Sequence, residues 1–112
     1  MTKSVELTLL YANWCGHCVT FKKQWNEIKN NIKKLNYKYN GVKFNANEFE
    51  EKQLKQGGKI NGKDIDGYPT LKITLNAGKE HKEYEYNKSR DAKIILDYIE
   101  KIGEKISTYK RK

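Results

Sequence analysis

Apolar and polar residues alternate through residues 5–12 and then change to a longer period. The odd positions from Val5 to Tyr11 are apolar, which predicts a strand, and the second half of this run is apolar on both faces, as in a strand inside a sheet. From Val19 onwards, apolar residues recur every three or four positions between lysines. This period predicts an amphipathic helix that ends near residues 35–37.

A second alternating run follows Asn40-Gly41 and predicts a short strand over Val42 to Ala46. Because a helix separates the two strands, the crossover is expected to make them parallel neighbours in a βαβ unit. Phe49 to Lys55 is expected to form a short polar helix. Gln56 to Gly67 contains four glycines and is expected to form a loop.

The rest of the pattern predicts a β-hairpin and a closing helix. Thr70 to Leu75 and Glu80 to Tyr86 both alternate, and a connection of hairpin length that contains a glycine joins them, so we expect antiparallel pairing. Ser89, followed by Arg90 and Asp91, is expected to cap the helix. The apolar stripe of this helix consists of Ile94, Ile95, Tyr98, Ile99, Ile102 and Ile106.

Together these elements predict one compact α/β domain, with a central mixed four-stranded sheet flanked by helices. The 112 residues are enough for one domain with a modest core, and we find no internal repeat. We place the domain at residues 1–108 and a basic tail at residues 109–112.

The net charge limits the kinds of partner. The formal charge of +9 comes almost entirely from lysines scattered along the chain, with Arg90 and Arg111 as the only arginines. Phosphate-binding surfaces favour arginine, so we expect no nucleic-acid partner, whereas the basic surface favours acidic proteins.

Localisation is inferred from what the sequence does not contain. No apolar run approaches the length that spans a bilayer, and the residues after Met1 do not form a signal peptide. We therefore expect an intracellular, cytoplasmic monomer with no membrane partner. The richness in Lys, Asn, Ile and Tyr is typical of an AT-rich genome, such as that of a parasite or a large virus.

The candidate chemistry lies in Trp14-Cys15-Gly16-His17-Cys18, which holds the only two cysteines of the chain. Cys15 is expected at the start of the first helix, where unpaired backbone N–H groups and the helix dipole favour a thiolate. It is therefore the expected nucleophile. A cysteine pair with this spacing and no other cysteine suits a reducing compartment, in which a disulfide is transient and catalytic.

Two other uses of the cysteine pair are disfavoured. A disulfide across two residues constrains the unfolded chain very little and would therefore stabilise the fold only slightly. The pair supplies half of a tetrahedral metal site, His17 lies where it could not readily join both sulfurs on one metal, and only a dimer could complete the site. We therefore expect no metal and no other cofactor.

Two motifs in this order resemble the thioredoxin superfamily, and most closely the a-type catalytic domains of protein disulfide isomerases. Tyr11 to Cys18 is similar to their active-site segment, and Gly67 to Lys72 is similar to their proline segment. The order of elements agrees over nearly the whole chain, but the extra N-terminal strand and helix of full thioredoxins are absent. The resemblance implies a thioredoxin-like fold and a protein thiol–disulfide oxidoreductase.

The resemblance also implies roles for individual residues. Pro69 is expected to follow a cis peptide bond and to lie against the cysteines, with the Tyr68 backbone positioned to pair with an extended substrate. Cys15 is expected to attack a substrate disulfide, and Cys18 to displace the substrate. The implied partners are proteins with cysteines or disulfides, and glutathione or a reductase would recycle the enzyme.

His17 bears on the direction of exchange, and Trp14 and Gly16 complete the active-site segment. A partly cationic imidazole at the helix start would stabilise the Cys15 thiolate, and hence the dithiol form. We therefore expect a reduction potential nearer to the value of about −180 mV for protein disulfide isomerase than to the value of about −270 mV for thioredoxin.

The chain departs from the family at Leu9, where relatives carry a buried acid that helps to move the proton of the second cysteine. The lysine that faces this acid is retained as Lys43, and a lysine buried without its anion would lose its proton or turn toward water. In one hypothesis, neutral Lys43 or a water that it holds accepts the Cys18 proton. In a second, Cys18 is activated slowly and mixed disulfides live longer. In a third, Leu9 simply packs better and solvent suffices.

Arg90 matches an arginine that, in disulfide isomerases, swings toward the active site and lowers the pKa of the second cysteine. Surface pairing or capping is the alternative role for Arg90. The alternative function for the chain is a binding module that recognises extended peptides through Trp14, Tyr68 and the turn at Pro69, with little redox turnover. Retention of both cysteines favours the enzyme.

Overall fold

The computed structural model describes residues 3–50, 59–60, 63–64, 67–106 and 109–110. The helices are α1 (Gly16–Ile32), α2 (Leu35–Lys38) and α3 (Ala92–Ile106). The strands are β1 (Lys3–Tyr11), β2 (Tyr39–Asn40), β3 (Val42–Glu50), β4 (Lys59–Ile60), β5 (Lys63–Asp64), β6 (Thr70–Ala77), β7 (Glu80–Tyr86) and β8 (Tyr109–Lys110).

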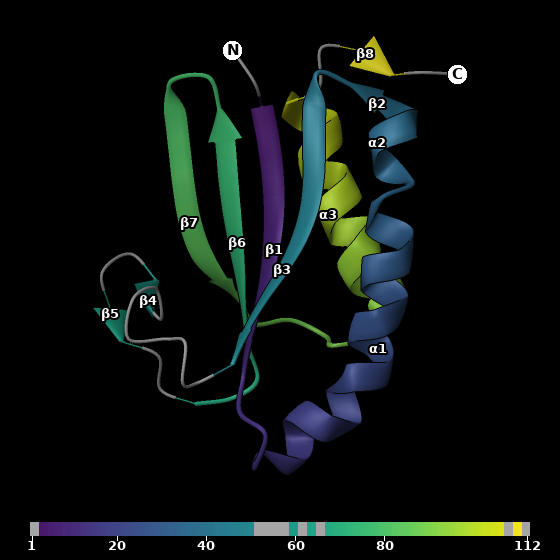
Figure 1. Ribbon diagram of the computed structural model, residues 1–112. Helices are drawn as coiled ribbons and strands as arrows, with labels where there is room; N and C mark the ends of the chain where they lie inside the picture. Colours follow the sequence, from purple (N-terminus) through teal and green to yellow (C-terminus); the bar gives the residue numbers. More distant parts are fainter. Residues whose placement is uncertain (1–2, 51–58, 61–62, 65–66, 107–108, 111–112) are drawn as a thin grey trace.

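Four strands form the central sheet in the order β3-β1-β6-β7 (Figure 1). β1 pairs parallel with β3 and antiparallel with β6, and β6 pairs antiparallel with β7. The hairpin turns at Gly78, whose φ of 68° lies in the left-handed region that favours glycine. The predicted mixed four-stranded sheet, its parallel pair and its hairpin are confirmed.

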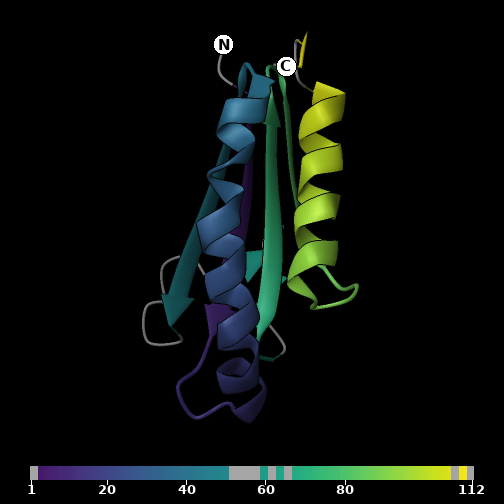
Figure 2. The ribbon, with the colours of Figure 1, turned by 90° about the vertical axis from the view of Figure 1, so that its right-hand side faces the viewer.

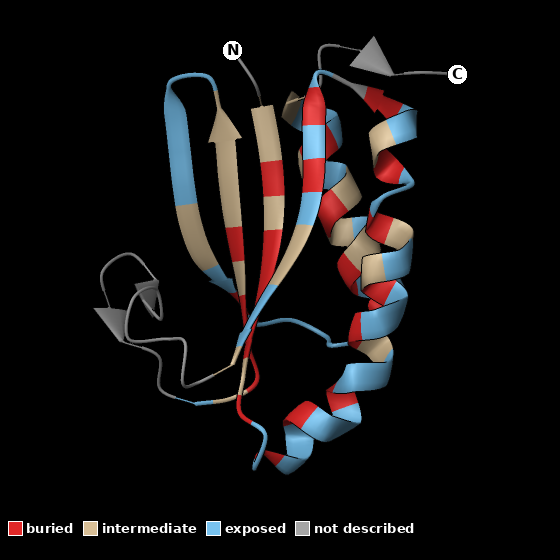
Figure 3. Cartoon of the chain, viewed as in Figure 1, coloured by how far each residue is buried: buried red, intermediate tan, exposed pale blue. Residues whose placement is uncertain are grey.

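Both long helices pack against the same face of the sheet and against each other (Figures 1 and 2). The stripe of buried residues along α1 faces the strands, as Figure 3 shows. Within the described part of the chain, no helix has the length and apolar character needed to cross a membrane. The most deeply buried large side chains are Val5, Leu7, Leu10, Trp25, Ile28, Ile32, Tyr39, Phe44, Ile73, Ile95 and Ile99.

The first helix is shorter than the pattern predicts, because α1 ends at Ile32 and α2 follows as a separate turn. The interruption leaves Leu35 buried against the core. It also places the Asn36 side chain beside β3, where its Oδ1 accepts the backbone N–H of Phe44 at 2.8 Å and its Nδ2 donates to the Phe44 carbonyl at 3.2 Å. These two bonds hold the end of the helical segment to the sheet.

Two expectations for shorter segments need correction. Phe49 and Glu50 continue β3, opposite Leu10 and Tyr11 of β1, because pairing with a long strand outweighs the weak helical pattern. The remainder of the predicted polar helix, residues 51–55, lies outside the described residues. The expected loop contains the short antiparallel pair β4 and β5. Near the end of the chain, β8 pairs antiparallel with β2.

The cap of α3 is Asp91 rather than Ser89. The Asp91 Oδ1 accepts the backbone N–H groups of Lys93 at 3.0 Å and Ile94 at 3.3 Å, which belong to the first turn of the helix. Ser89 lies further out: its Oγ accepts the Asp91 N–H at 3.2 Å, and its carbonyl accepts the Tyr86 hydroxyl at 2.6 Å. In the predicted apolar stripe, Ile95 and Ile99 are buried, Tyr98, Ile102 and Ile106 are half-buried, and Ile94 is exposed.

Candidate active site

The two cysteines lie where β1 ends and α1 begins. Cys15 is the N-cap of α1, with the extended backbone angles φ −83° and ψ 115°, and its Sγ accepts the backbone N–H of Cys18 at 3.1 Å. The sulfur therefore occupies the place of an ordinary capping oxygen, facing the unpaired N–H groups of the first turn. The Ala12 carbonyl accepts the Cys15 N–H at 3.1 Å and fixes the turn that leads into the helix.

The turn that contains the only proline lies directly against this pair. The peptide bond between Tyr68 and Pro69 is cis, which is the isomer that the resemblance implies. The Cys15 thiol donates to the Tyr68 carbonyl at 3.4 Å, and Tyr68 packs against a small cluster formed by Ala12, Cys15 and Cys18. Segments 53 residues apart in the sequence thus meet at the sulfur of the expected nucleophile.

Both thiols are free and nearly buried, with 6% exposure for Cys15 and 7% for Cys18. Exposure therefore does not distinguish the two sulfurs. Their surroundings do, because Cys15 contacts Tyr68 of the proline turn, whereas Cys18 lines a pocket between α1, β1 and β3. Of the two sulfurs, Cys15 is therefore the one beside the proline turn.

The surroundings of Cys18 raise the pKa of its thiol. Burial, followed by the hydrogen bond with the Cys15 side chain, raises the pKa of the Cys18 thiol to about 11. A hydrogen bond with the Ala12 backbone and the positive charge of Arg90 act in the opposite direction and lower this pKa. At neutral pH, Cys18 is therefore a thiol that must lose a proton before it can act as a nucleophile.

The other residues of the active-site segment lie on the surface. Trp14 is 71% exposed, and its ring meets the ring of Tyr68 edge-on, with centroids 6.0 Å apart. Gly16 and His17 are both exposed in the first turn of α1. A Cβ at Gly16 would meet nothing within 4 Å, so packing does not require glycine there.

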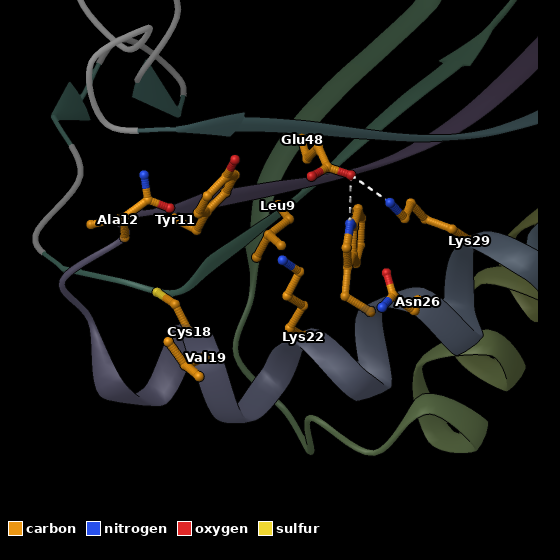
Figure 4. A pocket seen from close by; sticks show the side chains of 11 residues that line it. Leu9, Tyr11, Ala12, Cys18, Val19, Lys22, Asn26, Lys29 and Glu48 are labelled. Atoms are coloured by element: carbon orange, nitrogen blue, oxygen red, sulfur yellow. Dashed lines mark hydrogen bonds and ion pairs between the residues drawn. The ribbon is translucent and has the colours of Figure 1, made fainter.

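Leu9 lines the pocket beside Cys18 (Figure 4). This pocket has a volume of about 140 Å³, which is room for several waters. Its floor contains Leu9 and Trp25, and its charged groups are Lys22 and Lys29 from α1 and Glu48 from β3. Leu9 thus places an apolar side chain in a pocket that also holds three charged groups.

Glu48 is a residue of this pocket that the sequence analysis missed. It lies opposite Leu9 in the β1–β3 register and accepts hydrogen bonds from Lys29 Nζ at 2.8 Å and Trp25 Nε1 at 3.1 Å. The hydrogen bond from Lys29 holds the pKa of Glu48 below its usual value, although partial burial opposes this. The alternation that buries Val42 and Phe44 extends to Glu48, so a longer predicted strand would have identified it.

The two basic residues singled out by the resemblance have different positions. Lys43 is exposed, between the buried Val42 and Phe44, so it has turned toward water and the burial that the Lys43 hypothesis requires is absent. Arg90 is also exposed, but its charge acts on the Cys18 thiol. Of the two, Arg90 is therefore the one with an electrostatic connection to the cysteines.

A metal site is not evident in the part of the chain that the structure describes. No group of three or more His, Cys, Asp or Glu side chains there is arranged to hold a metal ion. The arrangement around the cysteines instead suits exchange between sulfur atoms, with one thiol beside a peptide-like turn and a second thiol behind it.

Residues 2–101 match the thioredoxin family. Protein disulfide-isomerase of Ricinus communis is 35% identical over 91 residues, which are 81% of this chain and 17% of that protein. The isomerase of Hordeum vulgare is 34% identical over 95 residues, which are 85% of this chain and 17% of that protein. The chain thus spans about a sixth of these relatives.

Solved structures share the fold. The Trx4 domain of ERdj5 has a TM-score of 0.63 and 26% identity, with 91% of this chain and 82% of that chain covered. The first thioredoxin domain of mouse protein disulfide-isomerase A4 has a TM-score of 0.63 and 22% identity, with 88% of this chain and 62% of that chain covered. With a family match over most of its length and the same fold, the chain belongs to the thioredoxin family and resembles the domains of protein disulfide isomerases.

Proposed function

We propose that the chain is a thiol–disulfide oxidoreductase that exchanges disulfides with protein substrates through Cys15 and Cys18. The observation that carries this proposal is the position of the Cys15 sulfur. It caps α1 through the Cys18 N–H at 3.1 Å and lies 3.4 Å from the Tyr68 carbonyl of the cis-proline turn. An extended substrate that pairs with this turn would bring its sulfur to Cys15.

The reaction takes two exchange steps. The Cys15 thiolate attacks one sulfur of a substrate disulfide, forms a mixed disulfide and releases the other substrate sulfur as a thiolate that takes up a proton. Cys18 then loses its proton to solvent and attacks the Cys15 sulfur. The Cys15–Cys18 disulfide forms, the second substrate thiolate leaves, and the substrate has gained two electrons.

The same steps in reverse oxidise a substrate dithiol. The surface contacts proposed for the substrate are Trp14, which is largely exposed, and the backbone of Tyr68. Glutathione or a reductase would return the cysteine pair to its starting state. Acidic segments of substrates would be attracted by the net charge of +9, most strongly at low salt.

The proposal is tested by insulin reduction with dithiothreitol and by refolding of scrambled ribonuclease. Cys15→Ser should abolish both activities, because the attacking sulfur is gone. Cys18→Ser should instead accumulate mixed disulfides with a substrate peptide, seen by mass spectrometry, because the resolving sulfur is gone.

A matched pair of outcomes separates the enzyme from the peptide-binding module. If wild type and Cys15→Ser bind an extended peptide equally well and neither wild type nor Cys18→Ser captures it covalently, the module is correct. Covalent capture that depends on Cys15 contradicts the module.

A further inference from the structure

The pocket beside Cys18 holds two lysines and one carboxylate. Its charged side chains are Lys22, Lys29 and Glu48. Glu48 forms an ion pair with Lys29, with 2.8 Å between the Lys29 Nζ and the Glu48 Oε1, and the charge of Lys22 also acts on Glu48. Among the described residues, no carboxylate lies within ion-pair distance of Lys22, so the formal charge of the pocket is positive.

Lys22 is placed by α1 on the side of Cys18. The two residues are four positions apart, so their side chains are neighbours on one face of the helix. In Figure 4, the Lys22 side chain extends from α1 into the pocket toward Leu9, and Cys18 and Glu48 lie on either side of it. Lys22 and the adjacent Lys23 are both exposed, but of the two only Lys22 lines the pocket.

The resolving step needs a negative charge at Cys18. Cys18 is 7% exposed, and burial of a thiolate in such a place is unfavourable without a compensating charge. Leu9 cannot take the proton, and Lys43 is exposed on β3. A nearby cation stabilises the thiolate directly, so that water in the pocket can accept the proton.

We propose that Lys22 promotes the resolving step by stabilising the Cys18 thiolate electrostatically, in a pocket where Leu9 provides no proton acceptor. The proposal rests on the exchange function proposed above. Lys22 acts through Cys18, so it is a positioning residue rather than a catalytic one. The charged and titratable groups that face the pocket and Cys18 are Tyr11, Cys15, Lys22, Lys29, Glu48 and Arg90.

The chemical step balances without a further reactant. The Cys18 thiol gives its proton to water or buffer, and the thiolate attacks the sulfur of Cys15 in a mixed disulfide with glutathione. The Cys15–Cys18 bond forms as the bond to glutathione breaks. Glutathione leaves as a thiolate and takes up a proton.

The test compares Lys22→Met, Lys22→Arg and Lys23→Met with wild type. Reduced protein is mixed with oxidised glutathione, samples are quenched with acid, and mass spectrometry follows formation and loss of the mixed disulfide from pH 6 to 10. We expect Lys22→Met to slow its loss about three- to tenfold at neutral pH, which is the effect of one cation several ångströms away near a protein surface. Formation of the mixed disulfide should not change.

The controls separate charge from shape. Lys22→Arg should keep the wild-type rate, because the charge remains, and Lys23→Met should keep it, because that charge lies outside the pocket. The difference in rate between Lys22→Met and wild type should be smaller at 1 M salt, because salt screens the Lys22 charge in the wild-type protein. Equal rates for Lys22→Met and wild type, or an equal defect in Lys22→Arg, would overturn the proposal.

A second measurement does not depend on turnover. Titration of the Cys18 Cβ by NMR in reduced, isotopically labelled protein should show the thiol of Lys22→Met ionising at higher pH than that of wild type. If wild type forms no mixed disulfide, the exchange function fails, and this titration still decides whether Lys22 acts on Cys18. An unchanged titration would overturn the proposal for Lys22 alone.

Discussion

At the scale of single residues, the two cysteines have the same exposure but opposite surroundings. Cys15 is held by the helix start and by the proline turn, whereas Cys18 is buried beside a pocket that contains lysines. Burial holds the Cys18 thiol as a neutral group at neutral pH. In the proposed function, this difference makes Cys15 the nucleophile and Cys18 the resolving thiol.

The raised pKa of Cys18 makes the resolving step depend on pH. Since only the thiolate attacks, the rate should rise about tenfold per pH unit above neutrality and level off near pH 11, where half of the thiol is ionised. Arg90→Met removes a charge that lowers this pKa, so it should slow oxidation by glutathione and move the profile to higher pH. Stopped-flow measurement of tryptophan fluorescence follows this step.

The control for Arg90 is Lys93→Met, which removes an exposed positive charge from the first turn of α3. Its pH profile should match that of wild type. If Arg90→Met and Lys93→Met give the same profile as wild type, Arg90 has only a surface role.

His17 should set the reduction potential. It is exposed in the first turn of α1, two residues after the Cys15 cap, where a cationic imidazole would stabilise a thiolate. The reduction potential of wild type is expected to be about −180 mV. His17→Ala should lower this potential by about 10–30 mV, because the dithiol form loses stabilisation. Equilibration with glutathione buffers, read by mass spectrometry, measures both values.

His81→Ala is the matched control, because His81 is exposed in β7 and bonds with Asn76. It should leave the potential unchanged. A wild-type value at or below the value of about −270 mV for thioredoxin contradicts the role given to His17.

At the scale of elements, the two long helices, α1 and α3, are capped at their N-termini by different chemical groups. A sulfur caps α1, and a carboxylate caps α3, with Asp91 Oδ1 accepting two N–H groups of the first turn. Both capping residues directly precede a helix whose buried side chains belong to the hydrophobic core. The start of α3 also receives the Gln24 side chain from α1, which accepts the Ala92 N–H at 2.8 Å and connects the two helices.

Substitutions measure how much the cap of α3 contributes to the free energy of unfolding. Asp91→Ala should lower the free energy of unfolding by about 1 kcal/mol, because two N–H groups lose their partner. Ser89→Ala should cost less, because Ser89 Oγ accepts an N–H that lies outside the helix. Urea denaturation of the two variants and wild type provides the comparison, and a larger loss for Ser89→Ala would show that the serine is the cap.

At the scale of the whole molecule, α3 approaches β3 closely at one glycine. Gly103 of α3 is buried, and a Cβ there would collide with the ring of Phe44, which is 1% exposed. The absence of a side chain lets the aromatic ring pack against the helix backbone. The close approach joins the last helix to the second strand of the βαβ unit.

Gly103→Ala should therefore lower the free energy of unfolding by about 1–3 kcal/mol through overpacking. In an open helix position, the same change would raise stability by about 1 kcal/mol, so the sign of the effect is diagnostic. The double variant Gly103→Ala/Phe44→Leu should recover part of the loss that Gly103→Ala causes in the Phe44 background. Urea unfolding of the four proteins completes the cycle, and a stabilised Gly103→Ala rules out the close contact.

The sequence predicted the elements that have strong, long patterns and missed those that depend on pairing. Alternation identified β1, β6 and β7, and the three- to four-residue period identified α1 and α3. Residues 49–50 were predicted as helix because their local pattern is weak and the partner strand that extends β3 is distant in sequence. Glu48 was missed for the same reason, since its place in the pocket depends on the register with Leu9.

The sequence by itself determined the order of the elements, the cysteine pair at a helix start and the likeness to disulfide isomerase domains, because these depend on residue type and local spacing. Only the tertiary structure decided that Lys43 faces water, that Arg90 acts on Cys18 and that Lys22 enters the pocket beside Leu9. Those facts depend on how strands and helices that are distant in sequence pack against one another, and local periodicity does not specify this packing.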